Sequence, residues 1–139
     1  MQPTQASIEN LRKLFVQGHV VYANQGSGKT SAIFQAADEF ARSCSCRIAI
    51  VAPSRDLLMA EAVRIRLRNA VPNQFARLDF FGESEIGDLK GTVPEVMVDD
   101  WFQLSEQSKE FLSKNFRILA AVGTDPSGTH KHGEQIRIK

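Results

Sequence analysis

Apolar residues along this chain gather into short runs that alternate with longer amphipathic stretches. The short runs have the length of buried strands, and they cover residues 19–23, 47–52, 76–81, 95–99 and 116–123. The longer stretches carry apolar residues every three or four positions, as helices with one buried face do, and they cover residues 5–15, 29–40, 56–68 and 104–114. This alternation predicts one α/β domain over residues 1–139, with a mostly parallel sheet flanked by helices.

The two ends of the chain refine this prediction. Thr4 stands directly before the first amphipathic stretch, where a hydroxyl side chain favours helix capping. Near the other end, a polar loop over residues 124–133 leads into residues 135–139, which alternate between polar and apolar side chains. That period of two is typical of a strand at the edge of a sheet.

One segment between the first predicted strand and the helix after it carries specific chemistry. It reads Ala23-Asn24-Gln25-Gly26-Ser27-Gly28-Lys29-Thr30. Small residues let backbone N–H groups close around phosphate oxygens, a lysine adds charge at the β- and γ-phosphates, and a hydroxyl suits Mg²⁺. A chance Gly/Ser turn is the alternative, but the strand before it and the helix after it are the context that a phosphate-binding loop requires.

A second chemical element lies at the end of a later strand. Residues 95–99 are mostly apolar and lead into Asp99 and Asp100. Ligands of parallel sheets gather at the carboxyl ends of the strands, and a carboxylate there can hold Mg²⁺ while its neighbour places a water molecule. The alternative is structural, because an Asp pair commonly caps the helix that follows it.

Together these segments resemble the first RecA-like domain of a superfamily-1 or superfamily-2 helicase, a P-loop NTPase. Five motifs match in order: a Pro-Thr-Gln before the first helix (residues 3–5), the phosphate-binding loop (23–30), motif Ia (51–57), motif II (98–101) and motif III (121–126). The short length and abbreviated motifs suit a viral or phage replication protein. The resemblance implies a RecA-like fold, with ATP and Mg²⁺ as cofactors.

The resemblance also implies a role for each matching residue. Gln5 would read the adenine base, and Lys29, Asp99 and Asp100 would carry the catalysis. Thr30 and Asp99 would hold Mg²⁺, and Asp100 would orient the attacking water. The phosphates would be bound by the loop and the start of its helix, at Gly26, Ser27, Gly28, Lys29, Thr30 and Ser31.

Two motifs depart from the family pattern. Asp100 stands where motif II usually has glutamate, so its carboxylate lies one methylene closer to the backbone. Motif III lacks its glutamine, which leaves Thr124, Asp125 and Ser127 as substitutes for the γ-phosphate sensor. The second RecA-like domain, which normally supplies arginine fingers, would come from another subunit, from another protein or from a further part of a longer chain, or would not be supplied at all. Without such a finger we expect slow hydrolysis.

Single-stranded nucleic acid is the partner that the resemblance implies. Residues 47–77 contain six arginines against two acidic residues. Arg64 and Arg68 lie one turn apart on a predicted helix, with Arg55 at its start, and the fork of an arginine suits phosphate oxygens. Phe80, Phe81, Trp101 and Phe102 are candidates for base stacking. The alternatives are solvated arginines and aromatic residues of the core.

Composition bears on the location of the protein and on metal binding. The net charge is +1, and no apolar stretch is long enough to span a bilayer, so we expect a cytoplasmic protein (host cytoplasm if viral) without a membrane partner. Cys44 and Cys46 have a poor spacing for zinc and are expected to be reduced thiols. His130 and His132 are expected to lie in a surface turn.

Three functions fit these observations. The first is a slow Mg²⁺-ATP-dependent ATPase of helicase or translocase type. The second is a non-catalytic nucleotide-binding module that acts as a switch or assembly factor, which the unusual motifs II and III favour. The third, a small phosphotransferase, would need an arginine-bearing lid and an acceptor site, and the polar loop 124–133 has neither.

Overall fold

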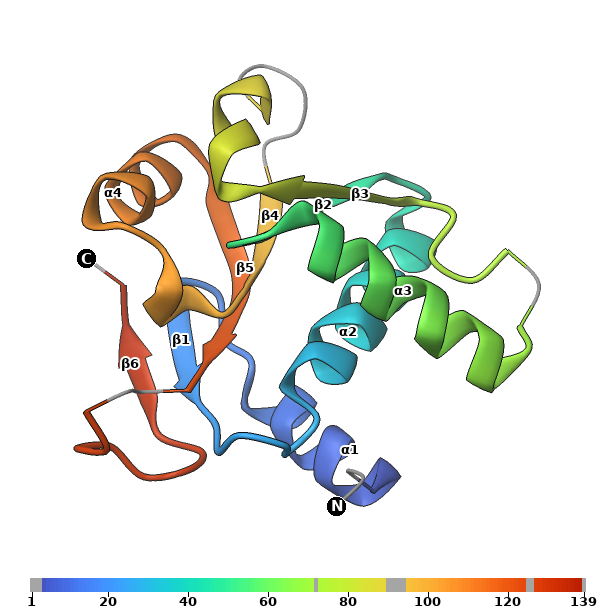
Figure 1. The fold of residues 1–139 in the computed structure, drawn as a ribbon, viewed down its shortest axis with the longest axis horizontal. Coiled ribbons are helices and arrows are strands. Elements are labelled where there is room, and N and C mark those ends of the chain that lie inside the picture. Colours follow the sequence, from blue (N-terminus) through green and yellow to red (C-terminus); the bar gives the residue numbers. More distant parts are fainter. Residues whose placement is uncertain (1–3, 72, 90–94, 125–126, 139) are drawn as a thin grey trace.

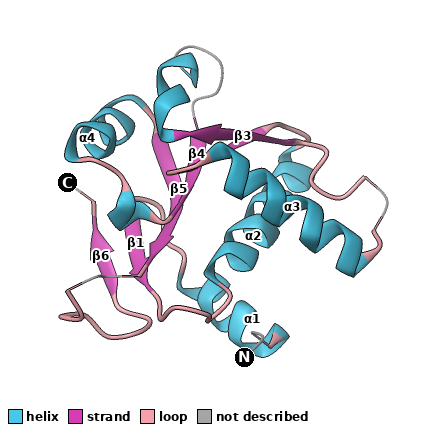
Figure 2. Cartoon of the chain, viewed as in Figure 1, coloured by secondary structure: helices cyan, strands magenta, loops and turns pink. Residues whose placement is uncertain are grey.

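A computed structural model describes residues 4–71, 73–89, 95–124 and 127–138 of the chain. A six-stranded sheet lies at its centre, with helices on both faces (Figures 1 and 2). The strands are β1 (His19–Tyr22), β2 (Ile48–Ala52), β3 (Leu78–Gly82), β4 (Glu95–Asp99), β5 (Arg117–Gly123) and β6 (Gln135–Arg137). The helices are α1 (Gln5–Leu14), α2 (Lys29–Cys44), α3 (Arg55–Asn69) and α4 (Glu106–Asn115), with 3₁₀ helices η1 (Glu83–Leu89) and η2 (Trp101–Gln103).

The sheet is mostly parallel, as predicted. Its strand order is β3-β2-β4-β5-β1-β6, and only the β1–β6 pair is antiparallel among the described strands. The α/β class and the edge strand near the end of the chain are therefore confirmed. Strand β5 lies between β1 and β4, so the carboxyl ends of these three parallel strands meet at one edge of the sheet.

Each face of the sheet has its own apolar core. Helices α1, α2 and α3 cover one face, where Val21, Ile50 and Met97 point, while α4, η1 and η2 cover the other, where Val20 and Val98 point. Successive side chains of a strand point to opposite faces. Burial on both faces explains why the strands are continuous apolar runs rather than alternating ones.

Helix boundaries follow local capping. The Thr4 hydroxyl accepts a hydrogen bond from the Ser7 N–H, and the Ser7 side chain contacts the Thr4 N–H in return, which confirms the predicted N-cap. Helix α4 begins at Glu106, two residues later than predicted. The reason is that Trp101–Gln103 forms a separate 3₁₀ turn, and the Ser105 side chain accepts from the Ser108 N–H to start a new helix.

The two cysteines are a correction to the sequence analysis, which expected reduced thiols. Cys44 and Cys46 are joined by a disulfide. Ser45 ends α2 in the left-handed conformation, with φ of 53° and ψ of 41°. This turn brings the two Cα atoms to 5.2 Å, within the range that a disulfide spans.

Candidate functional site

Residues 23–30, the candidate phosphate-binding loop, turn tightly from β1 into α2. Gly26 and Gly28 have φ values of 78° and 91°, a left-handed backbone that glycine adopts without strain. The Ser27 N–H and hydroxyl both contact the Asn24 carbonyl oxygen, at 3.2 and 2.6 Å. Helix α2 then begins at Lys29, and the N–H groups of a helix's first turn have no partner inside the helix. The loop therefore presents a helix N-terminus, which favours anions.

Thr30 and Asp99 meet at the start of this helix. The Thr30 hydroxyl donates a hydrogen bond of 2.8 Å to Asp99 Oδ2, although the two residues are 69 positions apart. The side chain of Asp99 is buried, and its other oxygen accepts from the Asp100 N–H at 3.0 Å. Burial raises the pKa of Asp99 to about 6, and the nearby charge of Asp100 acts in the same direction. The hydrogen bond from Thr30 and the charge of Lys29 oppose this rise.

Lys29 and Asp100 form an ion pair in the wall of a small cavity. Their Nζ and Oδ1 atoms lie 3.5 Å apart. The cavity has a volume of about 400 Å³ and is lined by Gln25, Lys29, Asp100, Phe102, Gln103 and Thr124. Asp100 has a left-handed backbone, with φ of 53° and ψ of 49°, and its side chain makes no capping hydrogen bond to η2. The Asp100 carboxylate therefore does not cap the helix that follows it.

Thr124 follows the end of β5 and lines the same cavity. Within the described parts of the chain, its Oγ1 is the one buried side-chain oxygen or nitrogen that lacks a hydrogen-bond partner. An unpaired buried hydroxyl is unfavourable unless a ligand or water completes it. Of the three substitutes predicted for motif III, Thr124 reaches the cavity. Ser127 contacts Thr129 instead, and Asp125 lies outside the described residues.

Gln5 lies on α1 beside the loop, and Ser31 lies in the first turn of α2. The Gln5 amide donates to Glu9 at 3.0 Å and to Gln35 of α2 at 3.3 Å. Its neighbour Ser7 donates weakly to the Ser27 carbonyl at 3.4 Å, which joins α1 to the loop. Ser31 is buried in the first turn of α2. The adenine contact of Gln5 stays a prediction, and Pro3 of that motif lies outside the described residues.

A loop that the sequence analysis treated as a surface turn contacts the root of the phosphate-binding loop. We call residues 127–134 the histidine loop. The Asn24 N–H donates to His132 Nδ1 at 3.0 Å, and the Gly133 N–H donates to the Tyr22 carbonyl at 2.7 Å. The His130 ring stacks on Tyr22 with centroids 4.1 Å apart. Contacts across 108 residues leave no local signal, so the sequence could not have identified them.

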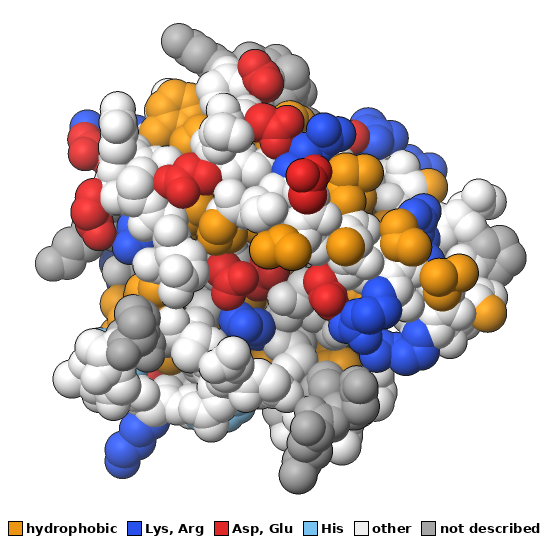
Figure 3. Space-filling view, viewed as in Figure 1, with side chains coloured by type: hydrophobic (Ala, Val, Ile, Leu, Met, Phe, Trp, Pro, Cys, Tyr) orange, Lys and Arg blue, Asp and Glu red, His pale blue; other side chains and the backbone are white. Residues whose placement is uncertain are grey.

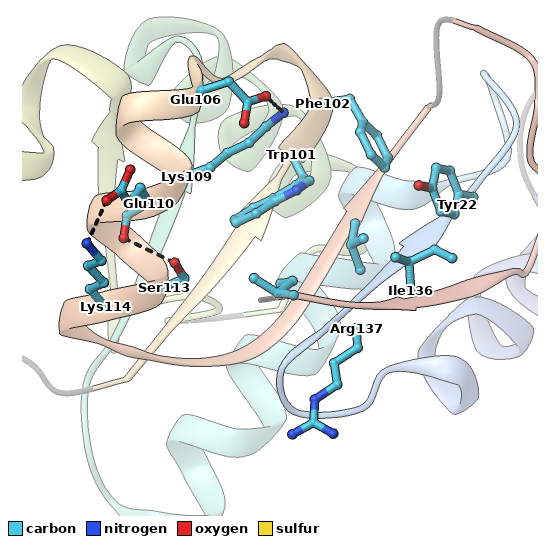
Figure 4. Close-up of a pocket in the computed structure, with 12 residues that line it drawn as sticks. Tyr22, Trp101, Phe102, Glu106, Lys109, Glu110, Ser113, Lys114, Ile136 and Arg137 are labelled. Carbon is cyan, nitrogen blue, oxygen red and sulfur yellow. Dashed lines mark hydrogen bonds and ion pairs between the residues drawn. The ribbon is translucent and has the colours of Figure 1, made fainter.

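A larger cavity lies beside the first, between α4 and β6 (Figure 4). Its volume is about 630 Å³, and aromatic side chains of Tyr22, Trp101 and Phe102 line one side. Phe102 borders both cavities and stacks on Tyr22, with ring centroids 4.6 Å apart. Trp101 is buried in the core. Phe80 packs edge-on against Phe34 in the other core. Of the residues predicted to stack on bases, Trp101 and Phe80 are therefore part of the apolar cores.

The predicted nucleic-acid residues lie away from both cavities, on α3. Arg55 approaches Glu85 with a distance of 3.7 Å, and Arg64 pairs with Glu61 at 2.6 Å. Hydrogen bonding and charge from Glu61 raise the pKa of Arg64 further. Arg68 is exposed one turn beyond Arg64. The structure thus places the three arginines on one helix, and nucleic-acid binding there stays a prediction.

Comparisons with known proteins do not identify the chain. No family model matches it, and no curated protein matches it. None of the described helices is both long and apolar enough to cross a bilayer. In the same part of the chain, no three His, Cys, Asp or Glu side chains come together as a metal-binding group. The helicase resemblance therefore stays an inference from motifs.

Proposed function

We propose that this protein binds ATP with Mg²⁺ and hydrolyses it slowly. The observation that carries this proposal is the hydrogen bond between Thr30 and Asp99. If the loop were a chance Gly/Ser turn, nothing would require the hydroxyl at the start of α2 to contact a buried carboxylate on a distant strand. A magnesium–phosphate site requires that pairing.

The chain supplies positive charge for the phosphates. Backbone N–H groups of the loop and of the first turn of α2 would donate to phosphate oxygens. Lys29 Nζ lies 3.5 Å from Asp100 Oδ1. A bound phosphate would give this ammonium a second anionic partner in the same cavity.

The available donors fit Mg²⁺. Thr30 and Asp99 offer hard oxygen atoms, and Mg²⁺ typically takes one or two carboxylates and completes its shell with phosphate oxygens and water. A protein cage of three ligands is therefore not needed. Held by Thr30 and Asp99, the ion would supply positive charge to the phosphate oxygens as negative charge develops on them.

Asp100 and Thr124 are the residues best placed to act on the attacking water and the terminal phosphate. The Asp100 carboxylate lines the cavity and accepts hydrogen bonds, so it would orient a water molecule and receive its proton. The Thr124 hydroxyl has no protein partner, so it is free to donate to a phosphate oxygen or to that water. Thr124 would thus replace the missing glutamine of motif III.

A non-catalytic nucleotide switch is the second candidate function. It is favoured by the Lys29–Asp100 ion pair, since a carboxylate held by the phosphate-binding lysine is not free to serve as a base. In this case the nucleotide would bind and change the contacts of Lys29 without being hydrolysed. Measurement of phosphate release separates the two functions.

Calorimetry with Mg²⁺ and a non-hydrolysable ATP analogue tests binding. We expect the wild type to bind and Lys29→Ala to lose binding, whereas Asp100→Asn keeps it. Phosphate release should be slow in the wild type and absent in Asp100→Asn. Equal analogue affinity for the wild type and Lys29→Ala would end the proposal. Binding without phosphate release in the wild type would favour the switch.

The resemblance extends this proposal to a helicase- or translocase-type motor on single-stranded nucleic acid. Arginine fingers contribute roughly 10³–10⁵ in rate where they occur. We therefore expect phosphate release to rise when single-stranded nucleic acid and a second RecA-like domain are both present. Unchanged turnover under those conditions would contradict the motor but not the ATPase.

A further inference from the structure

The disulfide between Cys44 and Cys46 closes a very small ring at the end of α2. The two cysteines are two positions apart, and they lie at the opposite end of the helix from the loop over residues 23–30 (Figure 1). A disulfide stabilises a fold mainly by restricting the unfolded chain, and this effect increases with the number of residues in the loop that it closes. A bond across one intervening residue restricts the unfolded chain very little, so stability gives little reason for it.

Main-chain hydrogen bonds bring the two cysteines together without help from the sulfur atoms. The N–H groups of Ser45 and Cys46 both donate to the carbonyl oxygen of Ala41, a residue that is fully buried. Ser45 is in the left-handed conformation, as is common where a helix ends in this kind of turn. Because this turn sets the distance of 5.2 Å between the Cα atoms, two reduced thiols would remain side by side.

The chain is anchored on both sides of the turn. After it, the Arg47 guanidinium donates to both carboxylate oxygens of Asp79 on β3, at 3.0 and 2.7 Å, and Ile48 begins β2 in the core. Before it, Ala37 and Ala41 of α2 are buried in the same core. Opening of the disulfide would therefore change the bonds of the two sulfur atoms and leave the fold in place. Such a site suits exchange chemistry rather than a change of conformation.

The two cysteines differ in accessibility. Cys44 is exposed, whereas Cys46 is half-buried and packs against the apolar core. Thiol–disulfide exchange begins with the attack of a thiolate on one sulfur of the disulfide, and access helps to decide which sulfur is attacked. Cys44 therefore carries the sulfur that an incoming thiol reaches, and Cys46 provides the leaving thiolate.

We propose that Cys44 and Cys46 form a thiol–disulfide exchange site for small thiols of the glutathione class. The thiolate of the small molecule attacks Cys44 Sγ and forms a mixed disulfide with it. The bond between Cys44 and Cys46 breaks, and its electron pair leaves on Cys46 Sγ, which takes up a proton from water. This assignment does not depend on nucleotide binding.

A second small thiol completes the exchange. Its thiolate attacks the small-molecule sulfur of the mixed disulfide and releases Cys44 as a thiolate, which is protonated in turn. The protein pair has then gained two electrons and two protons, and two small thiols have been oxidised to one disulfide. Glutathione disulfide drives the same steps in reverse, because the turn keeps both thiols within reach of each other.

Metal binding fits the reduced pair less well. Structural zinc sites use four ligands. In the ranges that the structure describes, no three His, Cys, Asp or Glu side chains lie together as a metal-binding group, and the sequence has no third cysteine. The pair is therefore assigned to exchange with thiols.

Equilibration of the folded 139-residue chain with glutathione and glutathione disulfide in varied ratio tests the proposal. Acid quenching, alkylation and mass spectrometry then count free thiols and mixed disulfides. We expect the pair to become reduced as glutathione is raised and to be reoxidised when glutathione disulfide is added back. Circular dichroism should stay unchanged throughout, since the turn does not depend on the disulfide.

A synthetic peptide of residues 42–47 is the matched control, because it carries the same two cysteines without the helix. In the folded chain the turn raises the effective concentration of one thiol at the other. At the same glutathione ratio, the disulfide should therefore be favoured at least about tenfold more in the chain than in the peptide.

Variants assign the roles of the two sulfur atoms. Cys46→Ser leaves Cys44 without its partner, so the mixed disulfide with glutathione should accumulate on Cys44. Cys44→Ser leaves the half-buried Cys46, which glutathione disulfide should modify at least about tenfold more slowly. The double variant should take up no glutathione, and its thermal midpoint should lie within about 5 °C of that of the wild type.

Four outcomes would overturn the proposal. In the first, glutathione reduces the disulfide only after urea has unfolded the chain, which would make the bond a structural cross-link. In the second, reduction of the folded chain lowers its helical circular dichroism signal, which would show that the bond holds the turn. In the third, the chain and the peptide reach the same equilibrium with glutathione. In the fourth, the mixed disulfide forms equally fast in Cys44→Ser and Cys46→Ser.

Discussion

Two buried polar side chains of the site, those of Asp99 and Thr124, lower the stability of the folded protein. Asp99 is a carboxylate buried at the end of a central strand, and its pKa of about 6 shows that burial disfavours its charge. Thr124 is a buried hydroxyl without a partner. Both features weaken the nucleotide-free fold, and both are satisfied if a cation and phosphate oxygens occupy the cavity. Such local conflicts are typical of functional positions.

The pH dependence of folding tests the first of these conflicts. The pKa of Asp99 in the folded protein lies above its ordinary value of 3.8. Between these two pH values the folded protein keeps the Asp99 proton, whereas the unfolded chain has released it. Stability should therefore fall as the pH rises from about 4 to about 6, by at most about 3 kcal/mol. Asp99→Asn should remove this fall and be more stable than the wild type at pH 7.

Urea unfolding without nucleotide or Mg²⁺, at a series of pH values, measures this difference. Asp88→Asn is the control, because Asp88 is an exposed carboxylate outside the site. Parallel stability profiles for the wild type and Asp99→Asn between pH 4 and 7 would contradict the raised pKa.

The unpaired hydroxyl of Thr124 gives a second prediction at this scale. Thr124→Val keeps the shape and removes the hydroxyl, so the free protein should be as stable as the wild type or slightly more stable, by about 1 kcal/mol. Single-turnover hydrolysis should nevertheless slow by roughly 10²-fold, since a donor to the terminal phosphate or water is lost. Thr124→Ser should restore much of the rate. A Thr124→Val protein with wild-type turnover would leave the hydroxyl without a catalytic role.

At the scale of elements, three connections hold the site together. Strand β5 separates β1 from β4, which fixes the distance between the phosphate-binding loop and Asp99. Gly123 ends β5, and a Cβ there would lie 2.9 Å from Phe102 and 3.1 Å from the Trp101 nitrogen, so only glycine lets η2 approach. The histidine loop closes the other side by its contacts with Asn24 and Tyr22.

Removal of the histidine contact should loosen the root of the phosphate-binding loop. His132→Ala deprives the Asn24 N–H of its acceptor, so this amide should exchange its hydrogen faster in NMR measurements. Nucleotide affinity should fall about fivefold, which corresponds to one neutral hydrogen bond. Lys131→Ala, in the same loop, is the control and should change neither quantity. Unchanged exchange at Asn24 in His132→Ala would show that the contact does not hold the loop.

At the scale of the whole molecule, binding and folding are linked. A ligand that binds only the folded chain stabilises it by mass action, by about 2.7 kcal/mol when its free concentration is one hundred times the Kd. Mg²⁺ with the ATP analogue should therefore raise the thermal midpoint of the wild type, and the rise should be absent in Lys29→Ala. An equal rise in both proteins would mean that the ligand binds away from the phosphate-binding loop.

The carboxyl edge of the sheet and the outer side of α3 expose different kinds of side chain. The carboxyl edge of the sheet holds the polar site, whereas the outer side of α3 exposes aliphatic residues among arginines (Figure 3). The sequence analysis identified the arginines but not this exposure. A periodic apolar pattern does not say which of two apolar faces a sheet will cover.

The sequence by itself determined the α/β class, the order of the elements and the position of the glycine-rich loop between β1 and α2. These features depend on short-range physics, namely apolar periodicity and the left-handed backbone that Gly26 and Gly28 adopt. Only the tertiary structure decided which distant residues meet. Thr30 with Asp99, Asn24 with His132 and the unpaired Thr124 depend on the strand order and on the course of the loops, which arise from packing contacts between residues far apart in sequence.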